Sequence, residues 1–202
     1  MIIKVCGITN TRDALVALDA GADALGFNFW PGSPRYLKDT AFLREVPANC
    51  WRVGLFVDED PQRVRDIMEE FSLDVAQLHR MNLTNLEALP GLRVWWAVNV
   101  TTTVTQSDLD AIPAEAYVLD APDGALAGGT GKTFDWSLAQ GLGSKILLAG
   151  GLDATNVGHA VEALRPWGVD ACSRLESEPG EKDPAKVWRF VEAARKAERE
   201  FL

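Results

Sequence analysis

The chain begins with Met1-Ile2-Ile3-Lys4-Val5-Cys6-Gly7-Ile8-Thr9, a short apolar run that ends in a lone thiol and a glycine. The run Ile2–Val5 has the β-branched, apolar character of a buried strand. Cys6 then falls where that strand meets its loop. In a closed parallel barrel the active site lies at the C-terminal ends of the strands, so Cys6 is a candidate catalytic group if the remaining chain builds such a barrel.

The same kind of run recurs along the whole sequence, in alternation with amphipathic segments. The runs are rich in Val, Leu and Ile and mostly lack polar alternation, which is typical of strands buried on both faces of a parallel sheet. Their spacing of roughly 20 to 28 residues leaves room for a crossover between neighbours. The expected strands are Ile2–Val5, Ala24–Phe29, Arg52–Val57, Val75–Leu78, Val94–Val98, Tyr117–Asp120, Lys145–Ala149 and Val169–Cys172.

Several helices are marked by their starts. Asp60-Pro61 and Asp183-Pro184 each read as an N-cap followed by proline at the first helical position, and apolar residues follow at helical spacing. The helix signal in segment 101–113 is weaker, because Thr101-Thr102-Thr103 is an unfavourable start for a helix. We expect a short or irregular fifth crossover there.

These elements predict a single (β/α)8 TIM barrel of the α/β class that spans residues 1–202 as one domain. No linker or low-complexity tract divides the chain. Eight βα units in 202 residues require tight connections, since such barrels usually span about 200 to 400 residues. A doubly wound open sheet is the alternative, because periodicity alone cannot close a barrel.

Composition narrows the function classes. The net charge of −9 supplies no basic stripe for nucleic acid or an anionic membrane, so an anionic substrate would need a locally built site. Three widely spaced cysteines fit neither a disulfide framework nor a CxxC metal pattern, and neither a leader peptide nor a membrane span is visible. We expect a cytoplasmic protein, and its oligomeric state, monomer or homodimer, stays open.

Asp120 ends the sixth expected strand just as Cys6 ends the first. A carboxyl group and a thiol at the mouth of one barrel can work as a proton donor and acceptor pair. Each also has a plainer interpretation. Asp120 would cap the turn Ala121-Pro122-Asp123-Gly124, and Cys6 would be a small buried hydrophobe.

The loops after the sixth and seventh strands are rich in glycine. Gly128-Gly129-Thr130-Gly131-Lys132 follows the sixth and Gly150-Gly151 the seventh. Exposed N–H groups in such loops can hold a phosphate, which barrels of this class commonly bind near the last strands. The alternative is that these glycines make tight turns. Two such loops at one mouth favour a sugar phosphate ligand.

Other polar residues near strand ends are weaker candidates. Arg35 could bind a carboxylate through its guanidinium, or could be a solvated loop residue. His79 follows the fourth strand and could line the mouth, although a lone histidine is more often structural. Asp170 lies within the eighth strand and is expected to orient neighbouring loops. Cys50 and Cys172 have no partner apparent in the sequence that would make them ligands or nucleophiles.

Taken in order, these motifs closely resemble the phosphoribosylanthranilate isomerase family of tryptophan biosynthesis. The resemblance spans nearly the whole chain, and the ordered set is far more specific than any one block. The matching blocks are Lys4 to Thr9, Gly26-Phe27 with Ser33-Pro34-Arg35, Val53 to Val57, Gln77-Leu78-His79, Leu119-Asp120, Gly128 to Trp136, Leu148 to Leu152, and Glu176 to Asp183.

The resemblance implies an isomerase that needs no cofactor and performs an Amadori rearrangement of N-(5′-phosphoribosyl)anthranilate. Asp120 would be the general acid that opens the ribose ring, and Cys6 the general base that removes the C2 proton. Arg35 would hold the anthranilate carboxylate. The implied substrate-binding set is completed by His79, Gly129, Gly131, Gly150, Gly151, Ser173 and Arg174.

Two residues depart from the family pattern. Arg174 stands where a glycine or small residue is usual beside the phosphate site, and it could add a charge, point outward or block the pocket. Arg80 replaces the glycine that normally follows His79, and we expect it at a solvated or rim position. Two alternatives stay open. They are an isomerase that also accepts the histidine-pathway ribonucleotide, and a sugar-phosphate sensor that has lost the chemistry.

Overall fold

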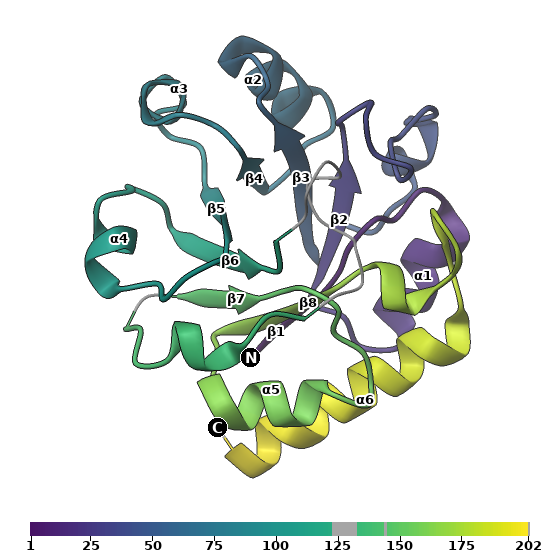
Figure 1. Cartoon of the computed structure of the whole chain (residues 1–202). Helices are drawn as coiled ribbons and strands as arrows, with labels where there is room; N and C mark the ends of the chain where they lie inside the picture. Colours follow the sequence, from purple (N-terminus) through teal and green to yellow (C-terminus); the bar gives the residue numbers. More distant parts are fainter. Residues whose placement is uncertain (123–132, 144, 202) are drawn as a thin grey trace.

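A closed barrel of eight parallel strands forms the centre of the computed structural model, which describes residues 1–122, 133–143 and 145–201 (Figure 1). The strands follow chain order around the barrel, and the eighth pairs with the first. The predicted barrel is confirmed, and each predicted strand end lies within one residue of the observed one. The strands are β1 (Ile2–Val5), β2 (Ala24–Asn28), β3 (Trp51–Val57), β4 (Val75–His79), β5 (Val94–Asn99), β6 (Ala116–Asp120), β7 (Ile146–Leu148) and β8 (Gly168–Ala171).

The crossovers between strands are tight, as the chain length requires. Asp60 caps α2 as predicted, because its side chain accepts hydrogen bonds from two backbone N–H groups of the first turn. The fifth crossover holds the five-residue α4, which confirms the expected short connection. The α-helices are α1 (Thr11–Asp19), α2 (Pro61–Glu70), α3 (Leu83–Glu87), α4 (Gln106–Asp110), α5 (Val157–Leu164) and α6 (Pro184–Phe201), and the 3-10 turns are η1 (Ala41–Arg44), η2 (Trp136–Ala139) and η3 (Ser173–Leu175).

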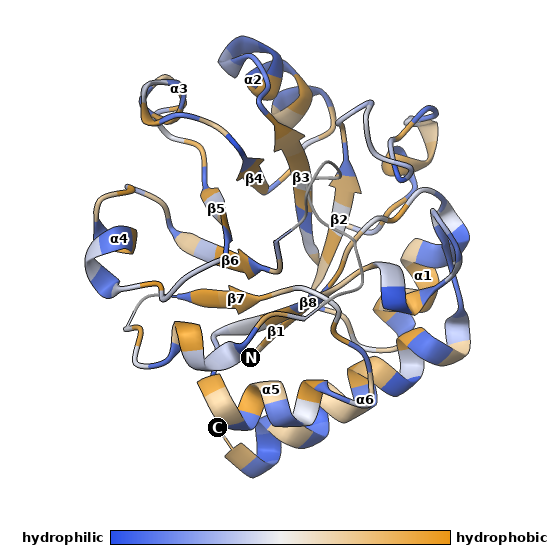
Figure 2. Cartoon of the chain, viewed as in Figure 1, coloured by the Kyte–Doolittle hydropathy of each residue, from blue (hydrophilic) through white to orange (hydrophobic). Residues whose placement is uncertain are grey.

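Apolar residues fill two layers, one between strands and helices and one inside the barrel (Figure 2). Trp51, Trp95 and Trp167 close the N-terminal end of the barrel, and we call them the aromatic plug. The rings of Trp51 and Trp95 stack with centroids 5.5 Å apart, and Trp167 meets Trp95 edge-on at 5.6 Å. Trp95 is fully buried, and burial of such a side chain stabilises the fold by about 2 to 3 kcal/mol. Part of this gain is offset, because its buried Nε1 has no hydrogen-bond partner within the described residues.

A small hairpin follows β8 and turns back toward β1. It consists of η3, β9 (Glu176–Glu178) and β10 (Glu181–Lys182), with Gly180 at a φ of +91° in the turn. α6 then runs along α5 and α1 (Figure 1). Among the described residues, no helix is long and apolar enough to cross a membrane.

Candidate active site

A pocket opens at the C-terminal mouth of the barrel, at the end away from the aromatic plug. It collects residues from loops and strand ends that are far apart in the chain. Gly129 and Gly131 lie outside the described residues. The other eight predicted site residues all line this pocket, namely Cys6, Arg35, His79, Asp120, Gly150, Gly151, Ser173 and Arg174.

Cys6 continues β1 into the pocket, two residues beyond Lys4 on the same inward face. Lys4 is fully buried, and its Nζ lies 2.8 Å from Oδ2 of Asp170 on β8. Burial alone would lower the pKa of Lys4, but Asp170 and then Cys6 together outweigh burial and raise that pKa, so the ammonium group stays charged. Asp170 therefore fixes a positive charge inside the barrel, close to the Cys6 thiol.

Cys172 directly follows β8, and the expectation that it has no partner is wrong. It lines the pocket together with Cys6, and its Sγ lies 3.9 Å from Nζ of Lys182 and 3.9 Å from Oε1 of Glu176. Hydrogen bonding with the Cys6 thiol, and then the charges of Lys182 and Arg35, lower the pKa of Cys172 to about 7 against burial and the nearby Glu176 carboxylate. The same hydrogen bond and burial raise the pKa of Cys6, although Lys4 opposes this. The first negative charge of the pair thus resides on Cys172.

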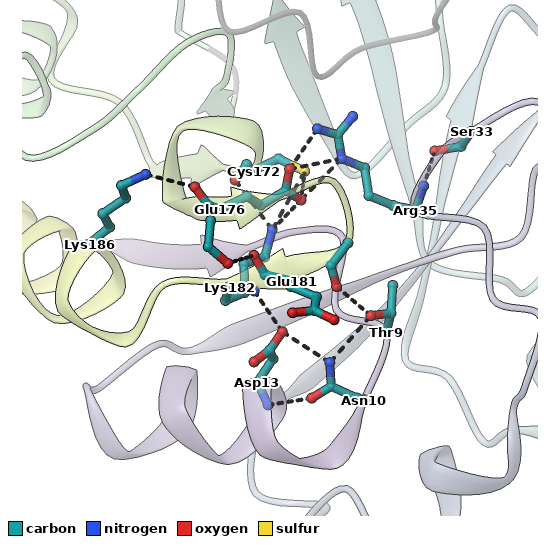
Figure 3. A network of polar contacts seen from close by, with 12 residues as sticks. Thr9, Asn10, Asp13, Ser33, Arg35, Cys172, Glu176, Glu181, Lys182 and Lys186 are labelled. Atoms are coloured by element: carbon teal, nitrogen blue, oxygen red, sulfur yellow. Dashed lines mark hydrogen bonds and ion pairs between the residues drawn. The ribbon is translucent and has the colours of Figure 1, made fainter.

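Arg35 enters the pocket from the loop after β2 and is held by Glu176 (Figure 3). Its Nε lies 3.1 Å from Glu176 Oε1 and its Nη2 lies 2.7 Å from Oε2, while Lys182 Nζ reaches Oε1 at 2.9 Å. All three side chains are buried. Burial alone would raise the pKa of Glu176, but Arg35 and then Lys182 hold it below its usual value. Arg35 is thus held in place by Glu176 and is not a solvated loop arginine. Glu176 was not identified from the sequence as a site residue.

Asp120 ends β6 and is buried, and its Oδ1 accepts a hydrogen bond of 2.8 Å from the backbone N–H of Ala121. Gly150 follows β7 beside it, with a φ of +86°. A Cβ at Gly150 would lie 2.8 Å from the Ala121 nitrogen and 3.0 Å from Asp120 Oδ1. A glycine is therefore required here both by backbone conformation and by the approach of the carboxylate.

Two further polar residues of the pocket, Asn28 and Gln77, were missed from sequence. Nε2 of Gln77 lies 2.9 Å from Nε2 of His79, which shares the inward face of β4. With the amide donating, this ring nitrogen accepts, and a neutral ring carries its proton on Nδ1. Asn28 and Gln77 could have been identified from sequence, because each is a polar residue within an otherwise apolar buried strand.

The two departures from the family pattern, Arg174 and Arg80, are both exposed. Arg174 lines the pocket on η3 with its side chain 44% exposed, and its Nη1 pairs with Oδ2 of Asp153 at 3.0 Å. Arg80 is exposed, as expected, and has a φ of +56°. That left-handed conformation gives a physical reason for a glycine at this position.

The described residues offer no metal-binding cluster. Within residues 1–122, 133–143 and 145–201, no cluster of three His, Cys, Asp or Glu side chains could hold an ion. The groups that face the pocket include the cations of Arg35 and Arg174, the carboxyl groups of Asp120 and Asp170, two thiols, and the backbone of Gly150 and Gly151.

Known proteins match this chain along nearly its full length. The family model described as N-(5′-phosphoribosyl)anthranilate (PRA) isomerase matches residues 3–193. The N-(5′-phosphoribosyl)anthranilate isomerase of Solibacter usitatus (strain Ellin6076) is 49% identical over 198 residues, which cover 98% of each chain.

Solved structures give the same result. The phosphoribosyl anthranilate isomerase of Thermus thermophilus has a TM-score of 0.88 at 32% identity, with 97% of this chain and 99% of that chain covered. A second isomerase, in complex with reduced 1-(o-carboxyphenylamino)-1-deoxyribulose 5-phosphate, has a TM-score of 0.78 at 30% identity and coverage of 97% and 100%. With its barrel, its pocket and these matches, the chain belongs to the N-(5′-phosphoribosyl)anthranilate isomerase family.

Proposed function

We propose that this protein converts N-(5′-phosphoribosyl)anthranilate to 1-(2-carboxyphenylamino)-1-deoxyribulose 5-phosphate by general acid and base catalysis in tryptophan biosynthesis. The observation that carries the proposal is that Cys6 and Asp120 line one pocket in a chain of this family. The related enzyme bound to a reduced form of that product supports the same substrate class. The substrate that we propose is thus a small sugar phosphate. We place the reaction in the cytoplasm, where free thiols persist.

Asp120 is the proposed general acid. Its carboxyl group donates a proton to the ribose ring oxygen, the C1–O bond breaks, and the anthranilate nitrogen supplies the electron pair that forms an iminium ion. The contact between Asp120 Oδ1 and the Ala121 N–H fixes the orientation of the carboxyl group. A fixed donor within reach of the leaving oxygen is what this step requires.

Cys6 is the proposed general base, and the order of steps explains how it acts. In the free protein its pKa is raised, first by the hydrogen bond with Cys172 and then by burial. The iminium ion formed in the first step brings a positive charge into the pocket, and such a charge favours the thiolate. The Cys6 proton passes to the neighbouring Cys172 thiolate, and the Cys6 thiolate then removes the C2 proton. The resulting enolamine tautomerises to the ketone.

Arg35 and the glycine loops are the proposed anchors of the substrate. Because Nε and Nη2 of Arg35 bind Glu176, the remaining Nη1 is the group that we assign to the anthranilate carboxylate. Backbone N–H groups of Gly150 and Gly151, together with the loop that holds Gly129 and Gly131, would bind the phosphate with Ser173 and Arg174. His79 would contact the substrate from the opposite part of the wall.

The test is the loss of fluorescence when purified protein meets freshly generated N-(5′-phosphoribosyl)anthranilate. We expect turnover by the unmodified chain, and a fall in kcat of roughly 10²-fold or more for Cys6→Ala and for Asp120→Asn. Cys50→Ala is the matched control, since Cys50 lies before β3 at the far end of the barrel.

Arg174→Gly is assayed alongside. Activity that emerges only in this variant would mean that Arg174 blocks the site. If neither the unmodified chain nor Arg174→Gly showed turnover, the proposed function would be contradicted. A near-normal kcat in Cys6→Ala would contradict the role of that residue.

A further inference from the structure

Cys6 and Cys172 stand next to each other on neighbouring strands. β1 and β8 run parallel, with Lys4 opposite Asp170 and Val5 opposite Ala171. The Cys6 N–H donates to the Ala171 carbonyl at 2.9 Å, so the register continues to the two cysteines. Since side chains alternate along a strand, the inward orientation of the Lys4–Asp170 pair places both thiols on the inward face as well.

This placement meets the geometric needs of a disulfide. Neighbouring strands lie about 4.8 Å apart, within the range of about 4.4 to 6.8 Å that disulfides span between Cα atoms. Cys6 and Cys172 both line the same pocket. Bond formation would therefore require rotation of two side chains rather than movement of the strands.

We propose that Cys6 and Cys172 form a reversible disulfide when the protein meets a peroxide oxidant, and that this bond blocks proton transfer by Cys6. The loss of activity rests on the proposed function, in which Cys6 is the general base. The bond itself rests on the register of β1 and β8 alone.

The chemistry balances with one peroxide. The Cys172 thiolate attacks a peroxide oxygen, an S–O bond forms, the O–O bond breaks, and the leaving hydroxide takes a solvent proton to become water. The Cys6 sulfur then attacks the resulting sulfenic acid. The S–S bond forms, the S–O bond breaks, and hydroxide leaves with the Cys6 proton as a second water. Two electrons pass from the two thiols to the peroxide, and a dithiol reverses the reaction by exchange.

The surroundings assign the first attack to Cys172 rather than Cys6. Cys172 is half-buried, whereas Cys6 is buried. The Lys182 ammonium lies 3.9 Å from the Cys172 sulfur and 3.3 Å from its carbonyl oxygen, and the nearby Arg35 adds a second positive charge. Oε1 of Glu176 also lies 3.9 Å from the sulfur, and the two cations outweigh this carboxylate. A thiolate supported by cations, with a second thiol in contact, is the arrangement of a peroxide-sensitive cysteine and its resolving partner.

The experiment treats the reduced full-length protein with hydrogen peroxide, blocks remaining thiols by alkylation and measures intact mass, tryptic peptides and isomerase activity. We expect a product two hydrogen atoms lighter and a linkage between peptides Val5–Arg12 and Ile146–Arg174. Mass and activity should both return with dithiothreitol. Cys50→Ser is the control that should behave like the unmodified chain.

Cys172→Ser separates the disulfide from direct damage to Cys6. We expect no loss of two hydrogens in this variant and an inactivation about tenfold slower, relative to its own untreated activity, without recovery by dithiothreitol. Three alkylatable thiols in the treated unmodified chain, or equally fast and reversible inactivation of Cys172→Ser, would overturn the proposal. A linked peptide from a protein that shows no isomerase activity when reduced would instead contradict the proposed function and leave the disulfide site intact.

Discussion

Glu176→Gln tests whether the buried charges at the mouth stabilise the barrel. The carboxylate of Glu176 is the shared partner of Arg35 and Lys182, and all three side chains are buried. Glutamine keeps the size of the side chain but removes its charge. The substitution therefore leaves two cations inside the protein without the anion that both of them contact.

The expected magnitude follows from the cost of an uncompensated buried charge. Removal of one partner from a buried pair costs about 3 to 5 kcal/mol. Glutamine can still accept one hydrogen bond, so we take the lower end of that range. For a chain of about this length, 1 kcal/mol lowers Tm by about 2 to 4 °C, which gives a decrease of about 6 to 12 °C.

Thermal unfolding of the two variants Glu176→Gln and Glu178→Gln provides the measurement. Glu178 lies two residues further along β9 and is exposed, so its substitution removes the same charge from the surface. We expect a change in Tm of less than about 2 °C for this control. An equally small change for Glu176→Gln would refute the reasoning, because it would show that the cations find other compensation.

The effect should also depend on pH. The pKa of Glu176 is held below its usual value of 4.5 because Arg35 and Lys182 outweigh burial. A carboxyl group with a lowered pKa in the folded state contributes its full stabilisation above the unfolded value and loses it as pH falls through the folded value. The difference in Tm between the unmodified chain and Glu176→Gln should therefore narrow in acid below about pH 4.5.

Three shorter predictions concern single residues. Gly150→Ala should lower kcat about tenfold or more, because its Cβ would lie 3.0 Å from Oδ1 of Asp120, whereas Gly158→Ala, whose Cβ meets nothing within 4 Å, should leave kcat unchanged. Arg165→Gly should raise stability by up to about 1 kcal/mol in denaturant unfolding, since Arg165 ends α5 at a φ of 45°. The rate at which peroxide oxidises Cys172 should rise about fivefold from pH 6 to pH 7, because its pKa is lowered to about 7 and the thiolate is the reactive form. A rate that is flat over this range would contradict the assignment of the first attack.

The strands could be predicted closely because each is a local pattern. A run of Val, Ile and Leu bounded by turn residues marks a buried strand wherever it occurs. Closure of the barrel is not local. It depends on β8 pairing with β1, and the contact that shows this inside the barrel, Lys4 with Asp170, joins residues 166 apart in the chain. Nothing in either segment alone specifies that partner.

The candidate site likewise contains residues that local sequence patterns predict and residues that only long-range contacts define. Cys6, Asp120 and Gly150 could be predicted because the barrel topology places every strand end at one mouth. Cys172 sits at such an end too, but its thiol is activated by Cys6 and by Lys182, which reaches it through the β9–β10 hairpin. The pairing of Arg35 with Glu176 spans 141 residues. Contacts of this kind depend on the packing of separate loops, for which periodicity carries no information.

Burial decides which cation at the mouth can turn toward a bound anion. The Arg174 side chain is 44% exposed, and a pair such as the one it forms with Asp153 is worth about 0 to 1 kcal/mol, so a phosphate can replace Asp153 at small cost. Separation of Arg35 from Glu176 would cost several times more, because both are buried. We therefore expect Arg35 to keep its orientation and offer Nη1, while Arg174 moves to the phosphate. In a chain with a net charge of −9, we expect the arginine that replaces the usual small residue to act as an added local cation rather than an obstruction.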